Sequence, residues 1–396
     1  MRVAACYGMP GPVTTPETCR SLYVHVPFCA SLCDYCDFYS VVLEPALVAP
    51  LVDAVLRELA AYASIRALDL DTFYIGGGTP TVLPPDELAC LLTGVRAYAS
   101  TTAEPEFTVE ANPATVTPEV AGVLMACGVN RVSLGAQSFQ PDELRTLGRR
   151  HQPEDVPATV ATLRRHGLAR INLDLIFGIP RQSLESWQRS LHTALQLAPD
   201  HLSCYGLTCE ADTPLRRKLE RGELEAVGED LEADMYELAL DVLPTLGLLQ
   251  YEISNFARPG CECRHNLRYW RNEPYLGIGP GAAGYVDGVR YRNVADIRSY
   301  VEKVSRGDAP WAEHEQLPPD GRARETAMLE LRLTSGIDRK RFAERFGADP
   351  AYLFADAIER HAQAGLLEVD ERAVRLTRAG LLVANRVMAD FLCDRV

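Results

Sequence analysis

Long apolar runs and an excess of positive charge are both missing from this chain of 396 residues. No apolar run approaches the roughly 20 residues that a membrane-spanning helix needs, so an integral membrane protein is not expected. Acidic residues outnumber basic ones by 54 to 40, and the net charge of −14 argues against a general nucleic-acid binder. Residues 1–20 lack the continuous apolar core of an export signal. We therefore expect a cytoplasmic protein with a disordered leader over residues 1–20.

A second CxxC pair is also missing, which narrows what the cysteines can do. Cys29, Cys33 and Cys36 form a CxxxCxxC motif. Three thiolates so close in sequence can converge on one metal centre, and thiolate is the ligand of iron–sulfur clusters. A cubane has four irons, so three cysteines leave one iron open to a small molecule that brings its own donor atoms.

Two other interpretations of the cysteine motif remain. Structural zinc sites usually take four ligands from paired short spacings, and this chain offers one such pair. A disulfide is less expected in a long chain without an export signal. The spacing therefore favours a 4Fe–4S cluster over zinc and over a disulfide.

The pattern of apolar residues predicts a parallel α/β fold. The length exceeds the roughly 250–300 residues at which single cores tend to split, so we expect one large and one smaller domain. Strands are predicted over residues 22–26, 72–75, 107–110, 131–134, 171–176 and 201–205. Helices are predicted over residues 45–63, 86–98, 118–127, 141–147, 153–166 and 184–197. Six β-α units in series imply helical crossovers, and a doubly wound sheet fits this alternation as well as a barrel does.

Glycine-rich or polar motifs stand at the ends of four of these strands. They are Gly-Gly-Gly-Thr-Pro at residues 76–80, Glu110, Leu-Gly-Ala-Gln-Ser-Phe at residues 134–139, and Asp174. The carboxyl ends of parallel strands converge at one edge of a barrel, and glycines let a backbone approach a ligand and expose its N–H groups. We expect these motifs to lie close to the cysteine loop.

The first motif, read with the residues before it, resembles a known family. Residues 23–29, Tyr-Val-His-Val-Pro-Phe-Cys, and Tyr35 before the last cysteine resemble the radical S-adenosylmethionine (SAM) superfamily, in its oxygen-independent coproporphyrinogen oxidase branch. Oxidases of that branch usually carry a further cysteine where this chain has Phe38, and Cys-Asp-Phe is the pattern of the heme-chaperone members, the HemW type. The resemblance implies a partial six-stranded (β/α)6 barrel of the TIM type, with SAM chelating the fourth iron.

The resemblance also assigns residues to SAM. The positions that match the SAM contacts of this branch are Tyr23, Gly77, Gly78, Thr79, Glu110, Gln137, Arg149 and Asp174. The glycines and Thr79 can bind the methionine ammonium or carboxylate. Glu110 can hydrogen-bond the amino or ribose groups. The planar guanidinium of Arg149 can bind a carboxylate through two parallel N–H groups. Asp174 can accept from ribose hydroxyls.

A second stretch, residues 251–270, ends in His-Asn-Leu-Arg-Tyr-Trp and resembles the HNxxYW run of the heme chaperones. The matching positions are His265, Asn266, Tyr269 and Trp270. A neutral imidazole is a good axial ligand of heme iron, so the resemblance implies a heme-linked His265. Two alternatives remain: a strand that packs the aromatic residues into the barrel, and Cys263 as the iron ligand. Ala283 stands where the relatives usually have histidine.

The predicted domains are a barrel over residues 21–248, an extension with the HNxxYW segment over 249–310, and a small domain over 311–396. Predicted helices and a hairpin over 366–376 give the small domain a helical, winged-helix-like character. Such shapes often bind DNA, but the acidity of the chain favours a packing or lid role.

The resemblance implies a heme chaperone that holds a 4Fe–4S cluster, SAM and heme and transfers heme to a hemoprotein, for example a respiratory one. A reductant such as a flavodoxin or ferredoxin is the other expected partner. A homodimer is one of the oligomeric states that the sequence leaves open, and no nucleic acid is expected. Two rivals share the fold. One is an oxygen-independent coproporphyrinogen III oxidase, which decarboxylates two propionates, and Phe38 argues against it. The other is a radical SAM methyltransferase or cyclopropanase.

Overall fold

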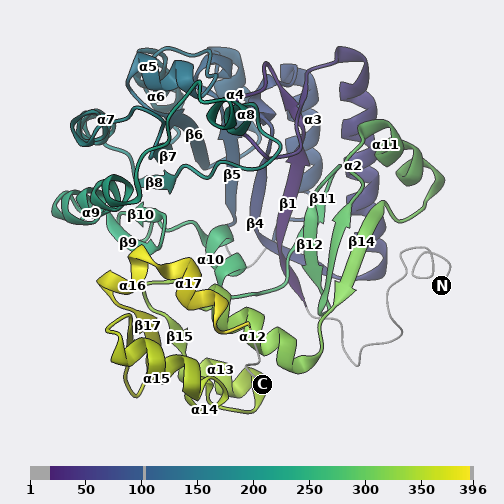
Figure 1. Cartoon of the computed structure of the whole chain (residues 1–396). Coiled ribbons are helices and arrows are strands. Elements are labelled where there is room, and N and C mark those ends of the chain that lie inside the picture. The colour runs from purple at the N-terminus through teal and green to yellow at the C-terminus, as the bar shows by residue number, and fades with distance from the viewer. Residues whose placement is uncertain (1–17, 101–103, 393–396) are drawn as a thin grey trace. The chain divides into compact units, whose positions relative to one another are not determined.

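The computed structural model describes residues 18–100 and 104–392. The chain forms two compact units, the first Met1–Ala239 with Pro274–Glu315 and the second Leu240–Glu273 with Gln316–Val396 (Figure 1). The expected boundaries at residues 248/249 and 310/311 therefore differ from those of the compact units. Residues 1–17 of the expected leader lie outside the described residues, and the first strand already begins at Cys19.

The first unit is built on a parallel sheet. In sheet order its strands are β11 (Leu276–Ile278), β1 (Cys19–Val26), β4 (Leu68–Gly77), β5 (Glu106–Ala111), β6 (Arg131–Gln137), β7 (Arg170–Phe177) and β8 (His201–Gly206). Neighbouring strands in this order are paired in parallel, and β1, β4 and β5 can be followed side by side in Figure 1. The six predicted strands are thus confirmed.

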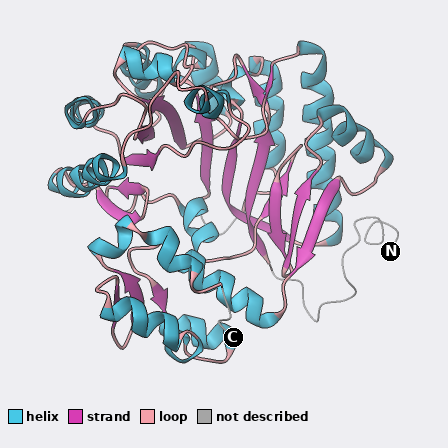
Figure 2. Cartoon of the chain, viewed as in Figure 1, coloured by secondary structure: helices cyan, strands magenta, loops and turns pink. Residues whose placement is uncertain are grey.

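Helices alternate with these strands (Figure 2). They are α2 (Pro45–Ile65), α3 (Pro85–Arg96), α4 (Pro118–Ala126), α5 (Pro141–Thr146), α6 (Asp155–Arg165) and α7 (Leu184–Gln196). Proline occupies the first turn of several, where its missing N–H costs nothing. On α7, Ser183 and Ser186 form a reciprocal capping box. The predicted helices are confirmed to within a few residues.

The two faces of the sheet differ in chemistry. Apolar side chains such as Phe73 and Phe107, whose rings lie 5.2 Å apart, are fully buried on one face. Because strand residues alternate in direction, Glu110 and Asp174 lie on the opposite face. Interiors of TIM-type barrels are usually filled with branched apolar residues. A polar face in their place makes the interior of this sheet a candidate binding region.

A second sheet in the first unit explains why that unit extends to residue 315. It has the order β12 (Ala283–Val286), β13 (Val289–Asn293) and β14 (Trp311–Gln316). The Trp311 ring stacks on Tyr291 at 4.9 Å. Trp311 was expected to open the small domain, and pairing with β13 places it in the first unit instead. The helix α11 (Ile297–Arg306) connects β13 and β14.

The second unit has its own core. Its small sheet has the order β15 (Ile337–Asp338), β17 (Ala373–Leu376) and β16 (Leu367–Val369), so the predicted hairpin is confirmed. Around it lie α12 (Pro319–Glu330), α13 (Arg339–Phe346), α14 (Pro350–Leu353), α15 (Ala355–Gln363), α16 (Arg378–Leu382) and α17 (Ala384–Ala389). Thr377 caps α16 as expected. The single final helix predicted over 377–392 is two helices, because the backbone leaves helical geometry at Val383.

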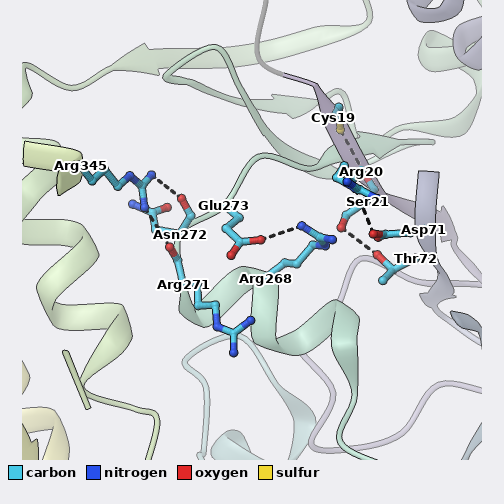
Figure 3. Close-up of polar contacts among 10 residues, drawn as sticks. All are labelled: Cys19, Arg20, Ser21, Asp71, Thr72, Arg268, Arg271, Asn272, Glu273 and Arg345. Carbon is cyan, nitrogen blue, oxygen red and sulfur yellow. Dashed lines mark hydrogen bonds and ion pairs between the residues drawn. The ribbon is translucent and has the colours of Figure 1, made fainter. Parts of the chain in front are cut away.

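Residues 240–273 belong with the second unit because side chains fasten them to it. This segment contains β9 (Leu249–Glu252), β10 (Asn255–Ala257) and α10 (Arg264–Trp270). At the end of α10, Arg345 donates to the carbonyl oxygens of Arg271 at 3.0 Å and Asn272 at 2.7 Å (Figure 3). A guanidinium suits the unpaired carbonyls of a helix C-terminus.

None of the helices in the described part of the chain combines the length and the apolar character of a membrane-spanning helix.

Candidate functional site

The three motif cysteines lie on one loop that is tied down from both sides. Cys29 ends β2 (Phe28–Cys29), which pairs with β3 (Val41–Val42). Asp34, in the middle of the loop, donates its N–H to the Leu147 carbonyl at 3.0 Å and accepts from the Leu215 N–H at 2.8 Å. Its carboxylate also forms an ion pair with Lys218 at 2.6 Å. These contacts hold the loop against residues far from it in the sequence.

Burial raises the pKa of two of the thiols on this loop. Burial raises the pKa of the Cys36 thiol to about 11, and the neighbouring Cys33 adds to this rise. Burial also raises the pKa of Cys29, while the Thr79 hydroxyl, 3.6 Å from its sulfur, opposes the rise. Binding of iron as thiolate must therefore release protons from the loop.

The residues present fit an iron–sulfur cluster. All three motif thiols are free and partly buried. Thiolate is the soft ligand that iron–sulfur clusters take, and a cubane requires each cysteine to bind a different iron.

The glycine motif after β4 packs directly on the cysteine-bearing strand. Gly78 donates its N–H to the Val26 carbonyl at 2.8 Å, and Thr79 donates to the Phe28 carbonyl at 2.7 Å. Gly77, at φ +107°, donates to the Glu110 carboxylate at 3.0 Å. The expectation that these N–H groups are exposed for a ligand is therefore wrong, because protein acceptors bind all three. The loop can offer carbonyl oxygens and the Thr79 hydroxyl, which suit a ligand ammonium.

Glu110 is a partly buried carboxyl poised between its neutral and ionised forms. Burial raises its pKa to about 7, and the nearby Asp174 adds to the rise. The Tyr74 hydroxyl donates to Glu110 at 2.8 Å and stabilises the carboxylate. Sequence reasoning missed Tyr74, although strand alternation places it on the same face, because tyrosine in a strand has no distinctive spacing. A cationic ligand beside Glu110 would favour the ionised form.

Asp174 is held by two further residues that the motifs did not reveal. Ser133 donates to one carboxylate oxygen at 3.0 Å, and Asn172 donates to the other at 2.7 Å. Burial raises the pKa of Asp174, and these hydrogen bonds oppose the rise. Both donors keep the carboxylate in a single orientation on the inner face of the sheet, where it can accept from ligand hydroxyls.

Tyr23 lies in a chain of contacts that leads back to the cysteine loop. Its hydroxyl is 2.9 Å from His25 Nδ1, and His25 Nε2 is 2.9 Å from the Tyr39 carbonyl. Burial, together with the nearby Glu110, raises the pKa of Tyr23, so the phenol stays neutral. His25 belongs to the opening motif but carried no predicted role, and its contacts show that it connects β1 with the end of the loop.

Gln137 and Arg149 meet at the end of β6. Gln137 has φ +64°, a left-handed conformation that non-glycine residues rarely adopt and that often occurs at functional sites. Arg149 donates to the Cys33 sulfur at 3.6 Å and to the Gly135 carbonyl at 2.5 Å. The structure therefore joins the predicted arginine to the predicted cluster loop.

His265 lies in the second unit, on α10. The HNxxYW segment is helical over Arg264–Trp270, so the alternative of a strand is wrong. The fully buried His265 ring has its Nε2 2.8 Å from the Tyr269 hydroxyl, four residues further along the helix. Cys263, the alternative iron ligand, stands at the start of this helix and is also fully buried.

Comparison with known proteins first gives the class. The Radical SAM superfamily model matches residues 23–194, and the HemN C-terminal domain model matches residues 317–383. The solved structure of coproporphyrinogen III oxidase (HemN) from Escherichia coli, a radical SAM enzyme, matches with a TM-score of 0.83 and 25% identity, covering 98% of this chain and 92% of that one. The fold and cysteine loop are thus those of a radical SAM protein, and the predicted partial-barrel fold class is confirmed.

Curated relatives then give the family. The heme chaperone HemW of Bacillus subtilis (strain 168) is 37% identical over 375 residues, which are 94% of this chain and 99% of the relative. HemW of Mycobacterium tuberculosis (strain H37Rv) is 38% identical over 97% of both chains. This chain belongs to the HemW heme chaperone family. Membership of the radical SAM superfamily implies a 4Fe–4S cluster and SAM.

We predict that SAM binding depends on pH through Glu110, which the resemblance assigns to SAM. Below its pKa of about 7 the carboxyl is neutral and attracts the cationic ligand weakly, whereas above that value it is ionised. We expect the affinity for SAM to rise about tenfold from pH 6 to pH 8 if only the ionised form binds. Anaerobic equilibrium dialysis of cluster-loaded protein measures this rise. The variant Glu110→Gln corrects for titration of the ligand's own amino group, and a wild-type profile as flat as that of the variant would contradict the assignment.

Proposed function

We propose that this protein binds heme and transfers it to a recipient hemoprotein, with a 4Fe–4S cluster on Cys29, Cys33 and Cys36 and SAM on the neighbouring strand ends. The observation that carries the proposal is the match to HemW chaperones along nearly the whole length of both chains. Phe38, where oxidases of the branch usually have a further cysteine, points the same way.

The chain's own residues would bind the nucleotide as follows. Carbonyl oxygens of the glycine loop and the Glu110 carboxylate receive the ammonium group. Arg149 receives the carboxylate, and Asp174, fixed by its two donors, accepts from the ribose. When bound, the cluster supplies an electron and an open iron for the amino acid part of SAM. In a chaperone this arrangement would trigger or shape heme transfer and would not turn over a substrate.

The heme iron ligand we propose is His265. Its Nε2 is engaged by the Tyr269 hydroxyl at 2.8 Å, so ligation through that nitrogen requires the pair to open. The buried imidazole would then exchange a neutral hydrogen bond for a bond to iron, and the freed phenol could hydrogen-bond elsewhere. Opening of a buried pair is a local change that binding of a large apolar ligand can drive.

An anaerobic hemin titration followed by absorbance tests this proposal. Reconstituted wild-type protein is expected to bind one hemin per chain with a saturable spectral change. We expect His265→Ala to lose the change or to bind at least tenfold more weakly. The exposed His192 on α7 provides a matched control, since His192→Ala removes an imidazole outside the motif.

Each result of this titration has a definite meaning. Absence of hemin binding by the wild type would overturn the heme role. Equal binding by wild type and His265→Ala would retain the role and exclude His265 as ligand, and Cys263→Ser would then be the next variant. The same proposal implies two partners, a recipient hemoprotein and a reductant. The recipient would be sought by measuring heme transfer to candidate apoproteins.

The rival function is coproporphyrinogen III oxidation, which the likeness to HemN favours. Incubation of the reduced protein with coproporphyrinogen III and SAM, followed by mass analysis, distinguishes the two. The chaperone proposal expects no decarboxylated porphyrinogen and no consumption of SAM. A product lighter by two carbon dioxides would establish the oxidase, and a methylated product would establish the methyltransferase.

A further inference from the structure

The Arg149 guanidinium connects the cysteine loop with the nucleotide side of the site. One terminal nitrogen, Nη1, lies 3.6 Å from the Cys33 sulfur. The other, Nη2, donates to the Gly135 carbonyl at 2.5 Å. The third nitrogen, Nε, is buried and has no hydrogen-bond partner. A buried donor without a partner is unfavourable, so Nε is available to an acceptor that a ligand brings.

The same short segment holds both the guanidinium and the loop. Arg149 donates its backbone N–H to the Leu144 carbonyl at 2.9 Å, and the Leu147 carbonyl accepts from the Asp34 N–H at 3.0 Å. Between them Gly148 has φ +72°, and a Cβ there would lie 2.9 Å from the Asp34 nitrogen. Arg149 and the loop are thus anchored to the same backbone segment, and the bond of Nη2 to the Gly135 carbonyl holds the guanidinium beside Cys33.

A fixed cation at this place changes the electron affinity of a cluster bound to Cys33. Reduction adds one negative charge, and a nearby positive charge or an N–H donor to sulfur stabilises the more negative state. Lys218, another cation near the loop, is already paired with Asp34 at 2.6 Å. Arg149, by contrast, donates directly to a cysteine sulfur at 3.6 Å.

We propose that Arg149 raises the reduction potential of the cluster through Cys33 and that the SAM carboxylate, received by Nε, counteracts this effect. The inference rests on the proposed cluster at the three cysteines and adds a role that is separate from holding the nucleotide. A carboxylate beside the guanidinium offsets its charge, so nucleotide binding lowers the potential. By linkage, the oxidised cluster then binds the nucleotide more tightly than the reduced one does.

A redox titration of reconstituted protein, monitored by electron paramagnetic resonance, tests the proposal. Iron and sulfide are measured first, so that failure to bind a cluster is separated from a change in potential. In Arg149→Gln we expect the ratio of reduced to oxidised cluster at a given applied potential to fall about tenfold, which is ~59 mV for one electron. Arg149→Lys keeps the positive charge but lacks the planar guanidinium. Its reduction potential should therefore change less than that of Arg149→Gln.

The neighbouring Arg150 gives a matched control. It is exposed, so Arg150→Gln removes the same formal charge next to the site and should leave the potential unchanged. In the wild type, SAM should lower the potential by more than in Arg149→Gln. An unchanged potential in Arg149→Gln with full iron content overturns the inference, and so does an equal shift in Arg150→Gln.

A second variant covers the case in which Arg149→Gln does not load iron. A Cβ at Gly135 would lie 2.8 Å from the Gln137 amide nitrogen and 3.2 Å from Arg149 Nη2. Gly135→Ala should therefore displace the guanidinium while keeping every charge, and the potential should fall in the same direction. A normal potential in Gly135→Ala overturns the inference, whereas a wild type without iron overturns the proposed cluster itself.

Discussion

Cys33→Ser is expected to lose the iron–sulfur cluster. Serine offers a harder oxygen donor in place of the soft thiolate that iron–sulfur chemistry requires. With three local cysteines, the loss of one leaves two irons of a cubane without a protein ligand. We expect iron to fall from ~4 per chain in the wild type to less than a quarter of that amount, with loss of the visible absorbance. Iron and sulfide analysis after anaerobic reconstitution measures the cluster content of the variant and of the wild type.

The fold should survive this substitution. The loop is anchored through Asp34 to Leu147 and Leu215, and none of these contacts involves the Cys33 sulfur. Circular dichroism and the thermal midpoint should therefore stay close to those of the wild type. Cys90, which is exposed on α3, is the matched control, and Cys90→Ser should keep its iron. Full iron in Cys33→Ser would refute the assignment of the loop as the cluster site.

Gly78→Ala is expected to weaken SAM binding strongly. A Cβ at Gly78 would lie 2.6 Å from the Phe28 carbonyl oxygen, and backbone atoms of Pro27 are the next nearest. These are backbone atoms, so the strain cannot be relieved by a side-chain rotation. Overpacking of this kind costs about 1–3 kcal/mol. If the strain moves the glycine loop, the affinity for SAM falls roughly 5- to 150-fold at 1.4 kcal/mol per decade.

Gly122 offers the matched control for this second prediction. It lies within α4, and a Cβ there would have nothing within 4 Å. Gly122→Ala should leave SAM binding unchanged and stabilise the protein by about 0.5–1 kcal/mol, since alanine loses less conformational freedom in a helix. Equal SAM affinities in Gly78→Ala, Gly122→Ala and the wild type would show that the glycine loop does not border the nucleotide.

The parallel sheet could be predicted because its signals are local. Each strand is a short apolar run followed by an amphipathic helix, and this order implies parallel pairing. The site at the strand ends followed from that topology, which brings Glu110, Asp174 and the glycine loop to one edge. What could not be predicted is which donor meets which acceptor. The Gly77 N–H donates to Glu110 at 3.0 Å because a partly buried carboxylate needs donors, and spacing alone does not reveal that need.

Domain boundaries were harder because they depend on contacts between distant residues. The end of α10 is held by Arg345, more than 70 residues away in sequence. Trp311 is held by Tyr291. No pattern in the sequence indicates either of these two contacts. The helical form of the HNxxYW segment was also missed, because its aromatic residues suit a strand as well as a helix.

The anchoring of the cysteine loop has a consequence for biosynthesis. Asp34 depends on Leu215 and Lys218, and Lys218 follows Asp34 by 184 residues in the chain. At about 5–20 residues per second, a ribosome needs roughly 10–40 s to add that length. The thiols thus emerge long before helix α8 (Pro214–Glu220), which carries Leu215 and Lys218. Cluster insertion into an ordered loop must wait for most of the barrel to be translated, and until then the nascent cysteines are open to oxidation or to the wrong metal.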